Sequence, residues 1–191
     1  MSNEEPGEYY TEDRWQNWLD RLREEDLNAE EEDSARLLLN LQDDTAIAVA
    51  KILTDYEDGT IDGERALAEL TDIHDVVLGE VSFDDEETEM LLDGVQTSLL
   101  CVLYAGQEFV AEGPAEGTIQ EYIEAATAAE EEDDLESALG YCVQAGTLVV
   151  DGRTLDLEMA EELDFGLVAE WVNGLDSLQT AMSDPEFVEE E

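Results

Sequence analysis

Apolar residues recur along almost the whole chain at a spacing of about 3.6 residues, which places them on one side of an α-helix. From residue 9 to residue 185 this pattern predicts an all-α fold, a single compact bundle of six to seven helices. Its longest helices are expected over 34–56 and 84–111. The second carries the apolar run 99–105, which we expect at the centre of the bundle. Residues 1–8 and 186–191 are expected to form solvated tails, the second one acidic.

Capping signals mark where these helices begin and end. A hydroxyl or carboxylate side chain just before an apolar period accepts a hydrogen bond from the first turn, and glycine or proline follows the last turn. Gly113-Pro114 ends the long central helix, and a final helix is expected over 165–182. The expected N-terminal caps are Thr11, Asp62, Thr118 with Glu121 as a capping box, and Asp133 followed by Glu136.

The segment 148–155 has two interpretations. Val150-Asp-Gly-Arg153 is either the stop of a helix or the tight turn of a short β-hairpin, because β-branched residues flank an Asp-Gly pair. The sequence leaves both open.

Charge is the next constraint. The chain has 54 Asp and Glu against 7 Lys and Arg, a formal net charge of −47, and 43% of its residues are apolar. That apolar content predicts folding rather than disorder, provided that salt screens the repulsion. At 1 M ionic strength the Debye length is about 3 Å, so we expect a protein that depends on high KCl for solubility and folding. Residues 66–152 contain no Lys or Arg, which disfavours direct nucleic-acid binding.

Nothing in the sequence predicts a membrane or secretory protein. The N-terminus has neither a basic nor an apolar region, and the run 99–105 is far shorter than the roughly 20 residues that span a bilayer. We expect a cytoplasmic protein. Cys101 and Cys142 lie in apolar helical patterns and are expected to be buried free thiols.

Motifs for metal or cofactor chemistry are weak. The acidic stretch 55–64 resembles a calcium loop, but its register puts Thr54, Tyr56 and Arg65 at ligand positions, so a helix–turn–helix is expected instead. His74 is the single histidine and is expected on a helix surface. We therefore expect no catalytic residue, no metal and no cofactor.

One enzymatic alternative stays open. The pairs Glu121/Glu124 and Glu158/Glu161 would each place two carboxylates on one helical face, as an Mg²⁺-dependent all-α nucleotide pyrophosphohydrolase would require. Such an enzyme also needs cations for the phosphates, and this stretch offers only Arg153.

The amides and the scarce basic residues are the most informative polar side chains. Residues 15–22 and 171–178 both read W-x-N-x-L-D-x-L, and six of the seven Lys and Arg lie within the first 65 residues. Either these positions are core residues and buried hydrogen-bond networks, or they form a protein-interaction face. The residues of that candidate face are Trp15, Asn17, Trp18, Arg21, Arg36, Asn40, Gln42, Trp171 and Asn173.

Four segments together resemble a known family. They are TEDRWQNWLDR at 11–21, SARLLLNLQDD at 34–44, DGVQTS at 93–98 and EWVNGLDSLQ at 170–179. They resemble an archaeal family, well represented in haloarchaea, that is catalogued only as a domain of unknown function. The resemblance implies an archaeal, salt-loving origin and carries over no activity. We therefore expect a non-enzymatic interaction or regulatory protein that binds another protein or itself.

Overall fold

The computed structural model describes residues 9–25, 30–163 and 166–183. Over these residues the chain is all-α and has no strand, which confirms the predicted fold class. Seven helices have thirteen residues or more, and α7 has six. Both expected tails lie outside the described residues. The helices are α1 (Glu12–Glu24), α2 (Glu32–Glu57), α3 (Gly63–Val77), α4 (Glu86–Glu112), α5 (Ile119–Glu131), α6 (Leu135–Val150), α7 (Leu157–Glu162) and α8 (Leu167–Ser183).

Local capping fixes most helix starts as predicted. The side chains of Thr11 and Asp62 accept hydrogen bonds from the first turns of α1 and α3, and Thr118 and Glu121 form the expected capping box of α5. The start of α6 is one residue later than predicted. Asp134 is its cap, because Asp133 takes the left-handed conformation (φ 62°) that turns the chain after α5. The predicted start of the last helix at 165 lies outside the described residues, and α8 begins at Leu167.

The hairpin interpretation of 148–155 is wrong, and the helix-stop interpretation is confirmed. Helix α6 continues through Val150, and Gly152 then turns the chain with a φ of 98°. The side chains of Val149 and Val150 are buried in the core, so tertiary packing overrides their preference for strands. The short α7 that follows was not predicted.

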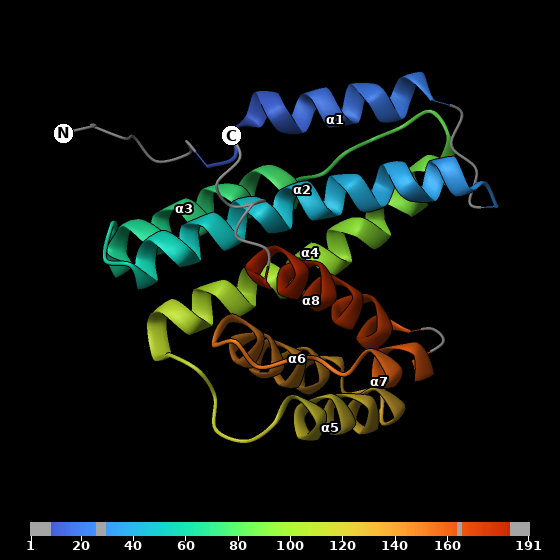
Figure 1. Ribbon diagram of the computed structural model, residues 1–191. Helices are drawn as coiled ribbons and strands as arrows, with labels where there is room; N and C mark the ends of the chain where they lie inside the picture. Colours follow the sequence, from blue (N-terminus) through green and yellow to red (C-terminus); the bar gives the residue numbers. More distant parts are fainter. Residues whose placement is uncertain (1–8, 26–29, 164–165, 184–191) are drawn as a thin grey trace.

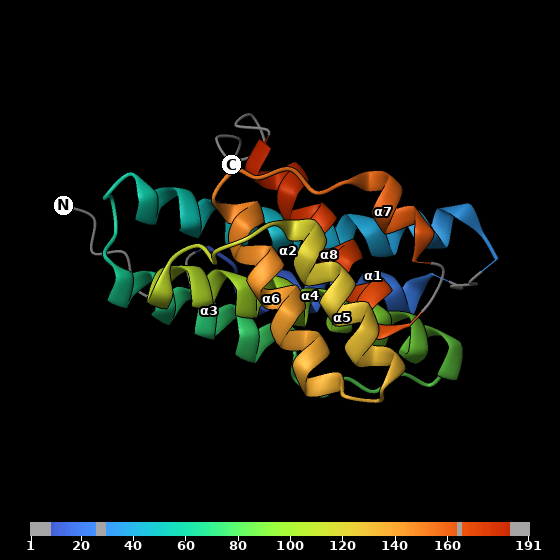
Figure 2. The same cartoon turned by 90° about the horizontal axis from the view of Figure 1, so that it is seen from below.

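The helices form layers, with α4 at the centre. Figure 1 shows α1 at one end of the molecule beside α2 and α3, then α4, then α8, and α5 with α6 at the opposite end. Figure 2 shows α5 and α6 from that opposite end. Helix α4 contacts α2, α3, α6 and α8. Its central position agrees with the prediction, since Leu99, Cys101, Val102, Leu103 and Ala105 are all buried.

Two glycines allow the central helices to approach closely. A Cβ atom added to Gly174 of α8 would lie 2.2 Å from the carbonyl oxygen of Ser98 in α4. One added to Gly146 of α6 would lie 2.4 Å from the Cβ of Ala105. Both distances are far below van der Waals contact, so α6 and α8 pack on α4 almost backbone to backbone.

The two cysteines are buried and free, as predicted. Burial raises the pKa of Cys142 to about 12, and the nearby Glu130 carboxylate adds to the increase. Burial also raises the pKa of Cys101 well above its ordinary value. Both thiols therefore stay protonated at neutral pH and act as small apolar core residues.

Candidate functional site

Four residues of the predicted face lie on α1, and two of these, Trp15 and Trp18, attach the helix to the rest of the molecule. Trp15 is 2% exposed and belongs to the core. The half-buried Trp18 donates its indole N–H to Asp44 Oδ2 of α2 over 2.9 Å, and the Arg21 guanidinium lies 4.8 Å from the Trp18 ring centroid. Asn17 is exposed.

Other basic residues near α1 also have partners within the chain. Arg14 forms a bidentate pair with Asp44, with a distance of 2.8 Å from Nε to Oδ2. Arg23 lies 5.3 Å from the Phe83 ring centroid. Arg14 and Arg23 thus each contact a residue outside their own helix.

Arg36 differs from these residues. It is exposed on α2, and in the part of the chain that the structure describes it makes no hydrogen bond, ion pair or ring contact. Asn40, one helical turn later, is also exposed. Each of the other basic residues has an interaction: Arg14, Arg21, Arg23, Lys51, Arg65 and Arg153.

The remaining predicted residues lie where α2 meets α8. Gln42 is buried, and its Nε2 donates to Ser177 Oγ over 2.9 Å and to the Asn173 carbonyl oxygen over 3.4 Å. It thus forms a buried network between the two helices. Trp171 is buried, whereas the Asn173 side chain is exposed. Helix α2 lies between α1 and α8 (Figure 1), so the two similar W-x-N-x-L-D-x-L segments place their Trp and Leu residues in the core from different sides of α2.

A groove of about 580 Å³ opens beside this network, between the N-terminal halves of α2 and α4 and the start of α8. Two large apolar side chains on its walls are exposed, Leu39 at 46% and Met90 at 69%. Sequence reasoning missed both, because neither lies on the apolar stripe of its helix. The groove is lined by Ser34, Ala35, Leu38, Leu39, Gln42, Met90, Leu91, Gly94, Val95, Glu170 and Asn173.

Two acidic residues, Asp43 and Asp176, lie near one another where α2 meets α8. Burial raises the pKa of Asp43 above its ordinary value, a hydrogen bond with Ser177 lowers it, and the nearby Asp176 carboxylate raises it further. Burial also raises the pKa of Asp176. The contact between α2 and α8 therefore holds two carboxylates that are destabilised when both are charged.

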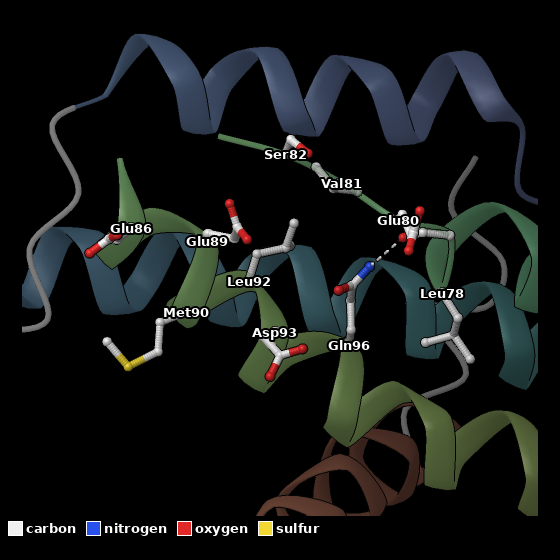
Figure 3. Close-up of a pocket in the computed structure, with 11 residues that line it drawn as sticks. Leu78, Glu80, Val81, Ser82, Glu86, Glu89, Met90, Leu92, Asp93 and Gln96 are labelled. Carbon is white, nitrogen blue, oxygen red and sulfur yellow. Dashed lines mark hydrogen bonds between the residues drawn. The ribbon is translucent and has the colours of Figure 1, made fainter. Parts of the chain in front are cut away.

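A second, acidic hollow of about 650 Å³ lies on the other side of Met90. In Figure 3, Glu89 and Leu92 extend toward the 80–82 segment, whereas Met90 extends away from it. Gln96 donates to the carbonyl oxygens of Val77 and Gly79 over 2.8 and 3.1 Å, and so ties the end of α3 to α4. No group of three or more His, Cys, Asp or Glu side chains within the described residues is arranged to hold a metal ion.

The glutamate pairs of the enzymatic alternative are exposed. Glu121 accepts the backbone N–H of Thr118 as part of the capping box, and Glu124 accepts from Gln120 over 3.0 Å. Glu158 and Glu161 lie on the short α7. The hydrolase alternative stays a prediction.

Comparisons with known proteins give a family and no activity. Residues 8–191 match the model of a family described as an uncharacterized protein conserved in archaea (DUF2150). No curated protein and no solved structure matches the chain. Across the described residues, every helix is too short or too polar to cross a bilayer.

Proposed function

We propose that this chain, which belongs to that archaeal family of unknown function, is a non-enzymatic protein-interaction module that binds a partner protein in the groove between α2, α4 and α8. The observation that carries the proposal is the exposure of Leu39 and Met90 on the walls of one groove. Contiguous exposed apolar side chains rimmed by polar ones mark interaction surfaces.

The composition of the chain strengthens this argument. With 54 acidic residues, its surface is otherwise suited to strong hydration, and high salt favours the burial of apolar groups. Exposed leucine and methionine side chains are therefore poorly suited to a salt-rich solvent unless another surface covers them. Methionine adapts its shape to a partner because it is unbranched and polarizable.

The groove fits the apolar face of a helix. Its walls are helices, its floor contains Leu38 and Val95, and its rim offers the exposed amide of Asn173 and the carboxylate of Glu170. An amphipathic helix laid into such a groove buries side chains at positions i, i+3, i+4 and i+7. The polar rim would then fix its register by hydrogen bonds.

The net charge supports a location in a cytoplasm rich in KCl. Screening over about 3 Å at 1 M salt removes most of the repulsion among surface carboxylates. Far-UV circular dichroism across a KCl titration tests this part: loss of helicity at low salt is expected. A fold that is fully stable in dilute buffer would contradict salt adaptation.

Affinity purification from a native high-salt lysate, with crosslinking, tests the interaction module. The Leu39→Gln and Met90→Gln variants should lose the captured protein, whereas Leu135→Gln should retain it. Leu135 is a matched control because it is 43% exposed but lies on α6, outside the groove. Equal capture by wild type and both groove variants would contradict the proposal, and so would turnover of nucleotides with Mg²⁺ in molar KCl.

A further inference from the structure

We infer that the groove binds a second copy of this chain. The two copies are related by a two-fold axis, so that the groove and the neighbouring surface of α2 in one copy contact the same groove and surface in the other. The inference rests on the proposed function, because it identifies the protein that the groove binds. Most symmetric dimers use such an isologous interface, in which each surface must complement itself.

Arg36 is the first observation behind this inference. The chain has 54 acidic residues, yet Arg36 has no carboxylate partner among the described residues. It follows Ala35, which lines the groove, and precedes the exposed Leu39 by one helical turn. An unpaired guanidinium therefore stands at the edge of the exposed apolar surface, where a docked protein would reach it.

The opposite wall of the same groove supplies the complementary charge. Glu170 lines the groove from the first turn of α8, while Arg36 is exposed on α2 between Ala35 and Leu39, which line the groove. A two-fold rotation exchanges the walls, so that Arg36 of each copy approaches Glu170 of the other copy and both pairs form at once. The surface is thus self-complementary in charge as well as in its apolar centre.

Leu39 and Met90 supply the apolar part of the interface. Leu39 is a large exposed side chain on the α2 wall, and Met90 is one on the α4 wall. When two copies associate, each wall of one copy contacts the groove of the other copy. Burying both side chains removes apolar surface from water, which favours association.

The overall charge predicts when the dimer forms. Two chains of −47 each repel one another across about 10 Å at 0.1 M salt but only about 3 Å at 1 M. Association should therefore require molar KCl, and the two Arg36–Glu170 pairs act at that salt concentration because the interface partly buries them, and buried pairs are screened much less than exposed ones.

Sedimentation velocity of the full chain in molar KCl tests the inference over a range of protein concentrations. The wild type and Leu135→Gln should be dimers, and Leu39→Gln, Met90→Gln and Arg36→Glu should each dissociate at least tenfold more readily. Circular dichroism in the same buffer checks that each variant is folded.

A charge exchange makes the test specific. Arg36→Glu and Glu170→Arg should each be mainly monomeric alone, because both of their homodimers juxtapose like charges. An equimolar mixture should form a heterodimer, since both pairs are then opposite in charge. Failure of the mixture to associate, or a dimer indifferent to both substitutions, would overturn the assigned pairing.

A wild type that is monomeric in molar KCl at all concentrations would overturn the dimer itself. The proposed function would still stand if another protein were captured in a manner that depends on Leu39 and Met90. Failure of both experiments would reject the groove as a binding site.

Discussion

Helix α1 and the central helices α4, α6 and α8 are held in place by different chemistry. Helix α1 buries Trp15, Leu19 and Leu22 in the core, and in addition its Arg14 and Trp18 side chains both bond to Asp44 of α2. The central helices meet almost backbone to backbone at Gly146 and Gly174. The difference follows the distribution of cations: residues 66–152 contain no Lys or Arg, so packing of small and apolar residues must hold the centre together.

Disrupting the contact between α8 and α4 at Gly174 should cause the largest loss of stability. Gly174→Ala places a methyl group 2.2 Å from a backbone carbonyl oxygen of α4, which cannot move away as a flexible side chain could. We expect a loss of about 3 kcal/mol in the free energy of unfolding, at the upper end for overpacked cores. Urea unfolding in molar KCl measures it.

Gly140→Ala is the control for this substitution. Gly140 lies in α6, is exposed, and has no atom within 4 Å of an added Cβ. Because alanine favours a helix over glycine by about 1 kcal/mol, this variant should be more stable than the wild type. Equal effects of the two substitutions would show that close packing at α4 is not what the central helices depend on.

Removing the Asp44 carboxylate, which bonds to α1, should cause an intermediate loss of stability. Asp44→Ala removes the acceptor of both the Arg14 guanidinium and the Trp18 indole N–H. The expected loss is about 1–2 kcal/mol, the usual range for charge-assisted hydrogen bonds that leave donors unpaired. Hydrogen exchange should accelerate in residues 12–24 while α4 stays protected.

Asp20→Ala provides the matched comparison within α1. Its carboxylate pairs with Arg23 over 3.2 Å on an exposed face, and such surface pairs contribute at most about 0.5 kcal/mol. If Asp20→Ala destabilised α1 as much as Asp44→Ala, the shared acceptor would not account for the attachment.

The same contrast explains which parts of the fold the sequence could predict. Helix starts depend on residues three positions apart, so Thr118 and Glu121 identify the α5 cap without tertiary information. The end of α6 cannot be predicted from such local residues, because whether Val149 and Val150 continue a helix depends on the core that buries them. The six-residue α7 is too short for a periodic pattern to reveal it.

The candidate site could be predicted only in part, for a related reason. Gln42 and Asn173 stand out in the sequence as amides in an acidic chain, and the Gln42 side chain donates to the backbone carbonyl oxygen of Asn173 beside the groove. Leu39 and Met90 carried no signal, because each is a single apolar residue off the stripe of its own helix. A groove made by three helices exists only once those helices are assembled.

A substitution in the acidic pair Asp43 and Asp176, between α2 and α8, should cause the smallest change in stability. Burial raises the pKa of Asp176, so its ionised form is disfavoured in the native state. Since the native state then binds the proton more tightly than the unfolded chain, this group lowers stability at neutral pH, and its penalty fades as the pH falls through the raised native pKa. Asp176→Asn should therefore stabilise the protein at pH 7, by about 0.5 kcal/mol or less, the usual size of a substitution at a partly exposed site.

The gain from Asp176→Asn should disappear near about pH 4, where the carboxyl of the unfolded chain also becomes protonated. Asp84→Asn removes the same formal charge from an exposed position and should change stability less at every pH. Thermal unfolding of the three proteins in molar KCl between pH 4 and 7 separates the two cases. A gain that is independent of pH, or shared equally by Asp84→Asn, would mean that relief of net charge accounts for it. In that event the contact between α2 and α8 would resemble the centre of the molecule, held by packing, rather than α1, where the Asp44 carboxylate adds specific bonds to the packing of Trp15.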